Sequence, residues 1–141
     1  IALVKDTVNI PVFGNGDVVT VKDAKQILED SGADGILVGR GTYGRPWFLN
    51  QISHYLKTGE RLAEPNIQEK MEIVLEHFDA IVSHYGTQPG IKIARKHLGW
   101  YSRGLSNSAQ FRQEVFQLDT ANAVKARIRA FYDPIVERLA A

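Results

Sequence analysis

The chain has 141 residues, enough for one ordinary domain or two small ones, and 44% of them are hydrophobic, which is enough to form a buried core. It contains no cysteine, which excludes disulfide bonds, thiolate metal ligands and a cysteine nucleophile within this sequence. Its formal net charge is only +1 and its apolar runs are far too short to cross a bilayer, so we expect a soluble protein of the cytoplasm.

Two short apolar runs near the start of the chain predict strands. Residues 8–13 are rich in β-branched side chains and end at Gly14, and residues 35–38 end at Gly39. The sequence passes directly from Ile1, which is not a start methionine, into what is predicted as a strand. We therefore expect the sequence to be a fragment of a longer protein.

A helix is predicted between the two strands. Thr20 and Asp23 have the spacing of a helix cap, and apolar residues then repeat at helical spacing as far as Gly32. Because a helix joins the two strands, they are expected to pair in parallel.

The next predicted helix covers residues 44–57, with a proline in its first turn, and stops at Gly59. Residues 61–66 are polar and contain a proline, and no strand is predicted after them. We therefore expect one domain over residues 1–60 and a second over residues 66–141.

The second domain is predicted to be entirely helical. A cap at Asn66, with Glu69 three residues later, begins a long amphipathic helix that is expected to end at Gly86 and Pro89. Further helices are predicted over residues 90–102, 108–117 and 121–139. Pro134 is expected to kink or interrupt the last one. The apolar residues at helical spacing in the first and last of these helices, which we expect to be buried, are Met71, Val74, Leu75, Phe78, Ile81, Val82, Tyr85, Val124, Ile128, Phe131, Ile135 and Leu139.

A glycine-rich loop follows each predicted strand, and the glycines are Gly14, Gly16, Gly39 and Gly41. At the carboxyl ends of parallel strands such loops let backbone N–H groups approach a phosphate, to which Arg40 would add a positive charge. In a (β/α)8 barrel, the loops after strands seven and eight commonly form such a site. The alternative is that these glycines only terminate strands, as they do in many α/β proteins.

Three segments of the chain resemble, in this order, the C-terminal third of bacterial tRNA-dihydrouridine synthases: IPVFGNGDV, GADGILVGRGTYGRPWFL and GIKIARKHLGWY. The resemblance covers essentially the whole chain. Other FMN-dependent barrels share the glycine loops but not the GRPW stretch followed by the ARKH helix. The resemblance implies an α/β plus all-α fold, mostly helical: the last two βα units of a TIM (β/α)8 barrel followed by a four-helix, bundle-like domain.

The same resemblance implies an FMN-dependent oxidoreductase that reduces uridine to dihydrouridine in tRNA, with NADPH as the electron source. It assigns contacts around the phosphate end of FMN to Asn15, Gly16 and Asp17 in the first loop and to Gly39 and Arg40 in the second. The family's catalytic cysteine, which protonates the uracil ring, and its lysine and histidine that contact flavin or substrate belong to earlier strands. We therefore assign no catalytic residue here and expect the chain to be inactive alone.

Asp17 has an alternative role, because an aspartate just before a helix is more often a helix cap than a ligand contact. The resemblance is compatible with both roles.

The charges of the helical domain are unevenly distributed. Residues 60–79 contain six acids and two bases, whereas residues 80–113 contain five bases and no acid. On a helical wheel of residues 90–103, one side is apolar and the other carries Lys92, Arg95, Lys96 and Arg103. This cationic stripe favours an anionic partner. The alternative is an ordinary solvated amphipathic helix.

The resemblance implies that the partner of this stripe is tRNA. Trp100 flanks the stripe and offers a surface for a sugar or an unstacked base, and His97 is a further candidate contact, although a structural role for it is equally compatible with the sequence. Phosphate contacts should dominate, which makes binding sensitive to salt. Candidates to extend the basic surface are Lys125, Arg127 and Arg129.

The four histidines do not have the spacing of a metal site. His77 and His84 are two helical turns apart, too far to share one ion, and no cysteine or well-spaced carboxylate completes a ligand set. We therefore predict no metal.

Two other functions remain open from the sequence. One is a stand-alone RNA-binding helical module, and the other is a different FMN-dependent barrel oxidoreductase. In either case the unpaired edge of a two-stranded sheet makes dimer formation through that edge an expected risk. The sequence does not indicate which uridine is modified or whether the fragment binds FMN.

Overall fold

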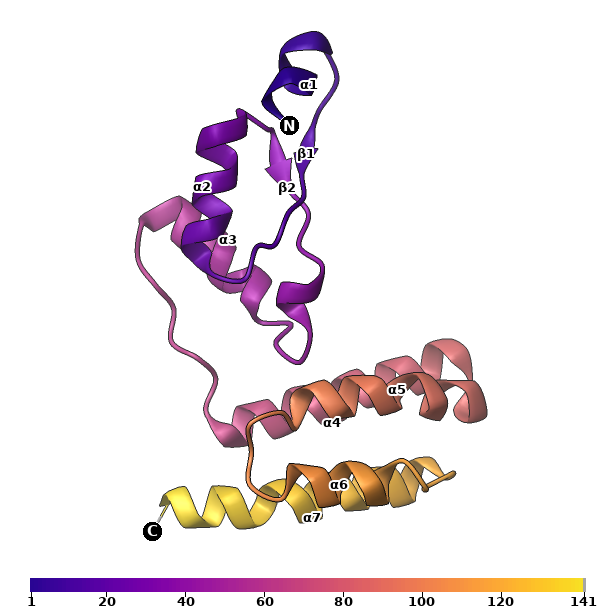
Figure 1. Ribbon diagram of the computed structural model, residues 1–141. Helices are drawn as coiled ribbons and strands as arrows, with labels where there is room; N and C mark the ends of the chain where they lie inside the picture. The colour runs from indigo at the N-terminus through magenta and orange to yellow at the C-terminus, as the bar shows by residue number, and fades with distance from the viewer. Residues whose placement is uncertain (141) are drawn as a thin grey trace. The chain divides into compact units, whose positions relative to one another are not determined.

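The computed structural model describes residues 1–140 of the chain, with side chains as far as residue 139. The chain divides into two compact units, Ile1–Ala63 and a second unit that begins at Glu64. Both are mostly helical (Figure 1). Among the described residues, no helix combines the length and the apolar character needed to span a membrane.

The first unit is built around a small parallel sheet. Its elements are α1 (Ala2–Thr7), β1 (Phe13–Gly14), α2 (Val21–Ser31), β2 (Gly35–Ile36), the 3-10 helix η1 (Arg40–Thr42) and α3 (Phe48–Thr58). Phe13 lies opposite Gly35 and Gly14 opposite Ile36, and both strands pack against α2 (Figure 1). The predicted parallel pairing is confirmed, whereas the complete barrel stays a prediction.

Both strands are shorter than predicted, and residues 2–7 form α1 instead of leading into a strand. The backbone N–H of Val12 donates to the Asp34 carboxylate at 2.7 Å, so it is not available to a neighbouring strand. The same carboxylate accepts from Lys5 of α1 at 2.7 Å, and these contacts lower the pKa of Asp34. Phe13 of β1 is 64% exposed.

Helix α2 has the predicted ends. The Thr20 side chain accepts from the backbone N–H of Asp23, the Asp23 carboxylate accepts from that of Thr20, and Gly32 closes the helix in the left-handed conformation at φ 63°. Helix α3 ends at Gly59 as predicted but begins at Phe48, because residues 43–47 form turns instead of a helical first turn. The core of this unit is the cluster Val18, Ala24, Phe48 and Ile52.

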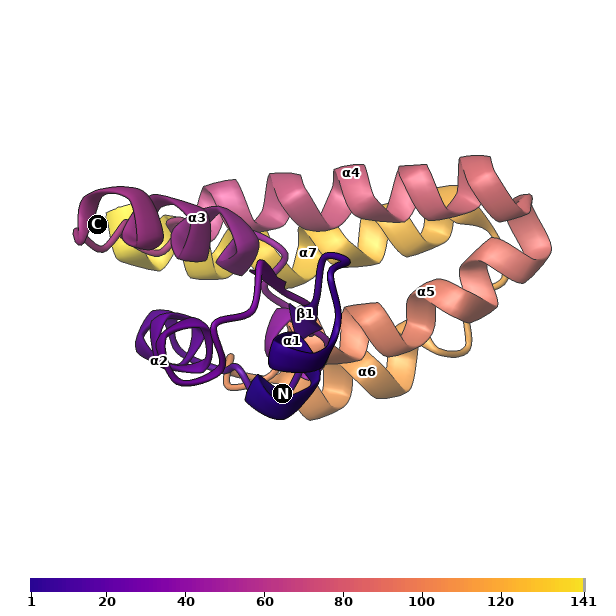
Figure 2. The ribbon, with the colours of Figure 1, turned by 90° about the horizontal axis from the view of Figure 1, so that it is seen from above.

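The second unit consists, within the described residues, of α4 (Ile67–Tyr85), α5 (Thr87–Tyr101), α6 (Ser108–Val115) and α7 (Ala121–Ala140). Helix α4 packs against α5 and α7, and α6 also packs against α5 and α7. The two views show α4 and α5 in one layer and α6 and α7 in the other (Figures 1 and 2). The predicted cap is present, because the Asn66 side chain and Glu69 exchange hydrogen bonds with each other's backbone N–H groups.

The predicted start of α5 is wrong, and so is the predicted interruption of α7 at Pro134, whereas a kink at that residue stays a prediction. Helix α5 begins at Thr87 and not at residue 90, because Pro89 falls in its first turn, where an N–H has no partner within the helix. Gly86 alone separates α4 from α5, and its φ of 83° allows the sharp reversal. Pro134 lies inside α7, which continues through it as one helix.

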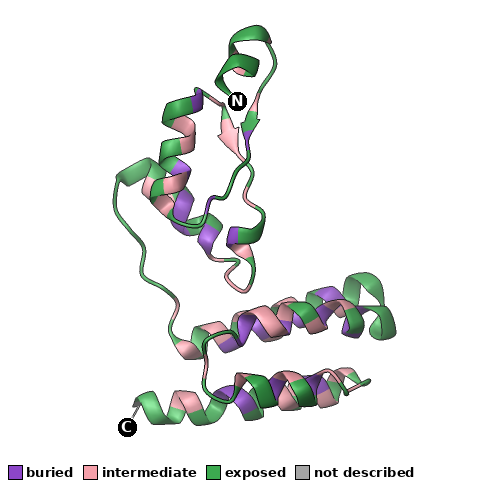
Figure 3. Ribbon diagram, viewed as in Figure 1, coloured by how far each residue is buried: buried purple, intermediate pink, exposed green. Residues whose placement is uncertain are grey.

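The core of the second unit is formed by buried residues of α4, α5, α6 and α7 (Figure 3). Of the predicted apolar stripes, seven residues are buried: Met71, Val74, Phe78, Ile81, Val124, Ile128 and Phe131. Leu75, Val82 and Ile135 are only partly buried. Tyr85 is 53% and Leu139 is 72% exposed, and both lie in the last turn of their helix. The fully buried Tyr132 was absent from the predicted core.

Candidate functional site

The first glycine loop is fixed at its far end by the cap of α2. Backbone N–H groups of Val19 and Thr20 donate to the Asp23 carboxylate at 3.1 and 2.7 Å, which lowers the pKa of Asp23. Asp17 has a φ of 37°, in the left-handed region that a residue with a side chain rarely adopts. The loop therefore leaves β1 and turns sharply before it enters α2.

The second glycine loop is tied to the first. The N–H of Leu37 donates to the carbonyl of Gly14 at 2.9 Å, and the carbonyl of Gly39 accepts from both the backbone and the hydroxyl of Thr42. Gly41 is buried, and a Cβ on it would lie 2.2 Å from the carbonyl oxygen of Val18. The two loops touch at this point, so only glycine fits there.

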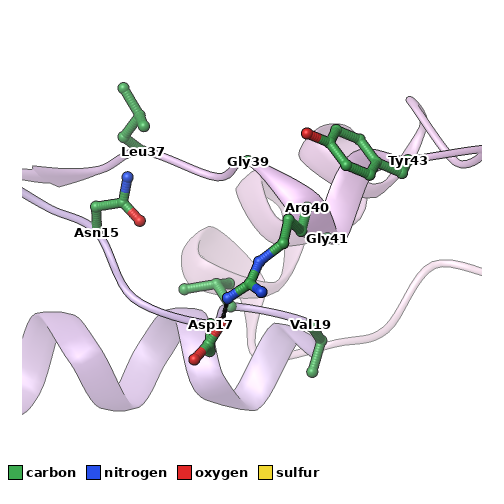
Figure 4. Close-up of a pocket in the computed structure, with 9 residues that line it drawn as sticks. Asn15, Asp17, Val19, Leu37, Gly39, Arg40, Gly41 and Tyr43 are labelled. Atoms are coloured by element: carbon green, nitrogen blue, oxygen red, sulfur yellow. Dashed lines mark hydrogen bonds and ion pairs between the residues drawn. The ribbon is translucent and has the colours of Figure 1, made fainter.

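A pocket of about 550 Å³ lies between the two loops and is lined by Asn15, Asp17, Val18, Val19, Leu37, Gly39, Arg40, Gly41 and Tyr43. Figure 4 shows the Arg40 side chain reaching across the pocket to Asp17, with which it forms an ion pair. Both side chains are largely exposed, at 77% for Arg40 and 81% for Asp17. The loops of the two strands thus meet at one concave surface, which carries the charged pair of Asp17 and Arg40.

The structure brings together Asn15, Asp17, Gly39 and Arg40 from the predicted loop residues. Gly16 is not among the residues that line this pocket; it lies beside α2, in a second and more open pocket. Asp17 pairs with Arg40, and the cap of α2 is made by Thr20 and Asp23 instead. The helix-cap alternative for Asp17 is therefore wrong.

The cationic stripe is exposed at Lys92 and Lys96 of α5 and at Arg103, which lies in the turn after α5. None of the three forms an ion pair with a described residue of this chain. The apolar side of the helix is buried as predicted, at Ile91, Ala94, Leu98 and Tyr101. Three cations are therefore available to an anionic partner.

Arg95 differs from the other cations of the stripe. Its Nη2 donates to the carbonyl of Leu118 at 3.4 Å, and its Nε is buried without a hydrogen-bond partner. Lys125 and Arg127, expected to extend the basic surface, are paired with Asp79 at 3.0 Å and Glu114 at 2.6 Å. Carboxylates of the same chain thus engage both side chains, and their part in a basic surface stays a prediction, whereas Arg129 is exposed.

His97 and Trp100 form part of a chain of ring contacts between α4 and α5. The His97 ring meets the Trp100 ring edge-on at 5.0 Å between centroids, and meets the His77 ring in the same way, also at 5.0 Å. The Nδ1 atom of His77 lies 2.9 Å from the Tyr101 hydroxyl. His97 and Trp100 are half-buried, so each has one face against the protein and another toward solvent.

Burial shifts the titration of this group. It lowers the pKa of His77 and His97, and for His97 the nearby His77 and Lys96 lower the pKa further. Burial raises the pKa of Tyr101 to about 12. The described residues contain no group of three or more His, Asp or Glu side chains placed to hold a metal ion.

Comparison with known proteins gives the family of this chain. The model of the family described as dihydrouridine synthase matches residues 1–135. The chain belongs to the dihydrouridine synthase family. It is 53% identical over 134 residues to a probable tRNA-dihydrouridine synthase of Rickettsia conorii. It is 43% identical over 132 residues to tRNA-dihydrouridine synthase B of Pseudomonas putida.

These alignments cover 95% and 94% of this chain but only 40% and 39% of the two relatives. The dihydrouridine synthase chain thus spans about two fifths of the length of the relatives it matches.

Sequence reasoning missed several residues of these sites. Val18, Leu37 and Tyr43 line the pocket. The ring of His77, whose Nδ1 lies within hydrogen-bond distance of the Tyr101 hydroxyl, contacts the ring of His97. The sequence offered one usable signal: the apolar residues that flank the glycines of a phosphate-binding loop form the walls of the pocket. The contact between His77 and Tyr101 depends on how α4 and α5 are rotated against each other, for which a single sequence holds no direct signal.

Proposed function

We propose that this chain carries the FMN-phosphate loops and the tRNA-binding helices of an enzyme that reduces uridine to dihydrouridine in tRNA. The observation that carries the proposal is the pocket in which Asn15, Gly39 and Arg40 meet from two loops, in a chain of the dihydrouridine synthase family. The first unit would supply the last two βα units of a (β/α)8 barrel, and the second a four-helix tRNA-binding domain.

The pocket suits the phosphate end of a flavin mononucleotide. Its volume of about 550 Å³ exceeds what one phosphate needs, and a Cβ at Gly39 would meet no atom within 4 Å, so the backbone there is open to a ligand. A guanidinium has five N–H donors, so the ion pair with Asp17 leaves donors of Arg40 for phosphate oxygens. The amide of Asn15 adds a neutral donor.

In the intact enzyme, reduced FMN would supply the hydride for the C5–C6 bond of uracil and would itself be oxidised, and NADPH would reduce it again. The residues of this chain bind and orient: Arg40 holds the anionic end of the cofactor, and the cations of α5 hold the RNA. No residue here is assigned to proton transfer.

The flavin assignment is tested by comparing FMN with riboflavin, which lacks the phosphate. Arg40→Ala is expected to weaken FMN binding about tenfold or more, as for loss of a charge-assisted hydrogen bond, and to leave riboflavin binding almost unchanged. Fluorescence quenching of each flavin by the purified chain measures both affinities.

Lys57→Ala is the matched control for this measurement, because it removes an exposed cation of the same unit outside the pocket. Equal loss of FMN and riboflavin affinity in Arg40→Ala would contradict a phosphate contact. Absence of FMN binding by the unsubstituted chain would count against the assignment of these two loops to the cofactor.

The tRNA assignment is tested on the exposed cations of α5. The triple variant Lys92→Ala, Lys96→Ala and Arg103→Ala is expected to bind an unmodified tRNA transcript at least about tenfold more weakly. The slope of log Kd against log salt should fall by about two to three, because each phosphate contact contributes nearly one. Fluorescence anisotropy at several salt concentrations measures both quantities.

The matched control removes three cations that are already paired with carboxylates, through Lys70→Ala, Lys125→Ala and Arg127→Ala. This variant has the same net charge as the test variant, so a general charge effect would weaken both equally. Equal weakening would therefore count against the cationic stripe as the tRNA surface.

A further inference from the structure

The contact between α4 and α5 holds two imidazoles beside the cationic stripe. His77 of α4 and His97 of α5 lie with their ring centroids 5.0 Å apart, and both are half-buried. On the outer side of His97 lies Trp100, also edge-on at 5.0 Å. Lys96, exposed and free of ion pairs with the described residues, is the neighbour of His97 along the chain. The pair therefore adjoins the surface proposed to bind tRNA.

Near neutral pH both rings of this pair are uncharged, because burial lowers the pKa of His77 and of His97. Since burial keeps the pKa of Tyr101 near 12, its hydroxyl stays protonated and can donate to Nδ1 of His77, which then carries its own proton on Nε2. Among the described residues, no carboxylate lies within ion-pair distance of either imidazole. No ion pair with a described residue therefore compensates a positive charge on the pair.

Each element that packs against the pair contributes charged or titratable side chains near it. Helix α4 contributes His77 itself, its chain neighbour Glu76, which is exposed, and, two residues after His77, Asp79, which is already paired with Lys125 of α7. Helix α6 approaches this part of α5 with Arg112, whose Cδ would lie 3.5 Å from a Cβ at Gly99. Tyr132 of α7 donates to the carbonyl of Tyr101. Apart from the exposed Glu76 and the paired Asp79, these groups are neutral or cationic.

We propose that tRNA binding to the cationic stripe is linked to the uptake of a proton by the His77–His97 pair. The inference rests on the proposed tRNA binding and adds its regulation by pH. Phosphate groups drawn to Lys96 would place negative charge beside His97, where the chain itself supplies none.

The direction of the effect follows from linkage. A nearby anion stabilises the imidazolium, so bound RNA raises the pKa of the pair above its value in the free chain. The affinity for tRNA is then highest at a pH below the pKa of the pair in the free chain, which lies under the ordinary histidine value of 6.5. The affinity falls as the pH rises through the pKa of the pair in the complex. Because two imidazolium rings at this distance repel each other, the pair takes up one proton and not two.

The expected effect is moderate. One added charge at a half-exposed site corresponds to about a threefold to fivefold change in affinity, so the ratio of Kd at about pH 7.5 to Kd at about pH 5.5 should be about three to five. His97→Gln and His77→Gln should each bring this ratio close to the value expected for a chain that lacks both histidines. Anisotropy with an unmodified tRNA transcript measures the ratio, and circular dichroism verifies the fold at each pH.

His84→Gln is the matched control, because His84 is an exposed histidine of the same helix α4 and contacts Tyr85 instead of the pair. It should keep the full pH dependence. The linkage is overturned if His77→Gln and His97→Gln both keep the ratio of the unsubstituted chain, or if His84→Gln lowers the ratio as much as they do. Either result leaves the proposal of tRNA binding itself intact. Absence of tRNA binding at every pH overturns the proposed function as well.

A measurement on the unsubstituted chain covers the case in which a variant fails to fold. Calorimetric titration of tRNA in two buffers with different ionisation enthalpies reports the protons taken up on binding. Uptake of a fraction of a proton near pH 6.5 supports the linkage, and identical binding enthalpies in the two buffers overturn it.

Discussion

Replacing Gly90 with alanine is expected to lower the free energy of unfolding of the helical unit by about 2–3 kcal/mol, as for overpacking against a rigid neighbour. A Cβ at this position would lie 2.8 Å from the Cα of Val82 and 3.2 Å from the carbonyl oxygen of Ile81. Both atoms belong to the backbone of α4 and cannot move aside by a rotamer change. The two helices would have to separate, and the packing of the buried Ile81 and Ile91 would weaken.

Gly99 provides the matched control on the same helix. A Cβ there would lie 3.5 Å from side-chain atoms of Arg112 and Phe116, which is an ordinary contact distance. Gly99→Ala should therefore be neutral or stabilise the unit by about 0.5–1 kcal/mol through helix propensity. Hydrogen exchange of the amides of α4 and α5 measures both variants. Comparable protection in the two would contradict the close approach at Gly90.

Gly41→Ala is expected to destabilise the first unit by a similar amount, about 2–3 kcal/mol. The new Cβ would lie 2.2 Å from the carbonyl oxygen of Val18 and 3.2 Å from side-chain atoms of Phe48 and Val38. Relief requires the two glycine loops to move apart, which disrupts the hydrophobic core and the pocket together. The amides of α2 and α3 should then exchange about 30- to 150-fold faster, while those of the second unit keep their protection.

Gly16→Ala is the corresponding control in the first unit. Its Cβ would approach only the Cδ1 of Ile27, at 4.0 Å, and its φ lies outside the left-handed region. Its stability should stay close to that of the unsubstituted chain. If Gly41→Ala exchanged no faster than Gly16→Ala, the proposed contact between the loops would be wrong.

Helix ends were predictable from sequence where the determinants are local. The caps at Thr20 and Asn66 place donors and acceptors within three residues of each other, and Gly32 supplies a positive φ at a helix end. Each of these signals acts without help from the rest of the fold. The exception at Pro89 has the same kind of origin, because proline is tolerated in a first turn as readily as it ends a helix.

Strand extent and side-chain partners were not predictable, because they depend on distant residues. The length of β1 is set by Asp34, whose carboxylate takes the N–H of Val12 that a longer ladder would use. The pairing of Arg40 with Asp17 likewise joins two loops that a whole helix separates. The residues of the pocket were predictable as two loops, but their closure into one site needed the parallel register of β1 and β2.

The single glycine between α4 and α5 has a consequence for how the chain acquires its structure. Gly86 leaves no slack, so the two helices come together as soon as each has formed, and almost no loop-closure entropy opposes their contact. Helix α7, in contrast, reaches α4 only after the chain has passed through α5 and α6. The hairpin of α4 and α5 is therefore the natural folding nucleus of the second unit, with α7 docking afterwards onto a surface already in place.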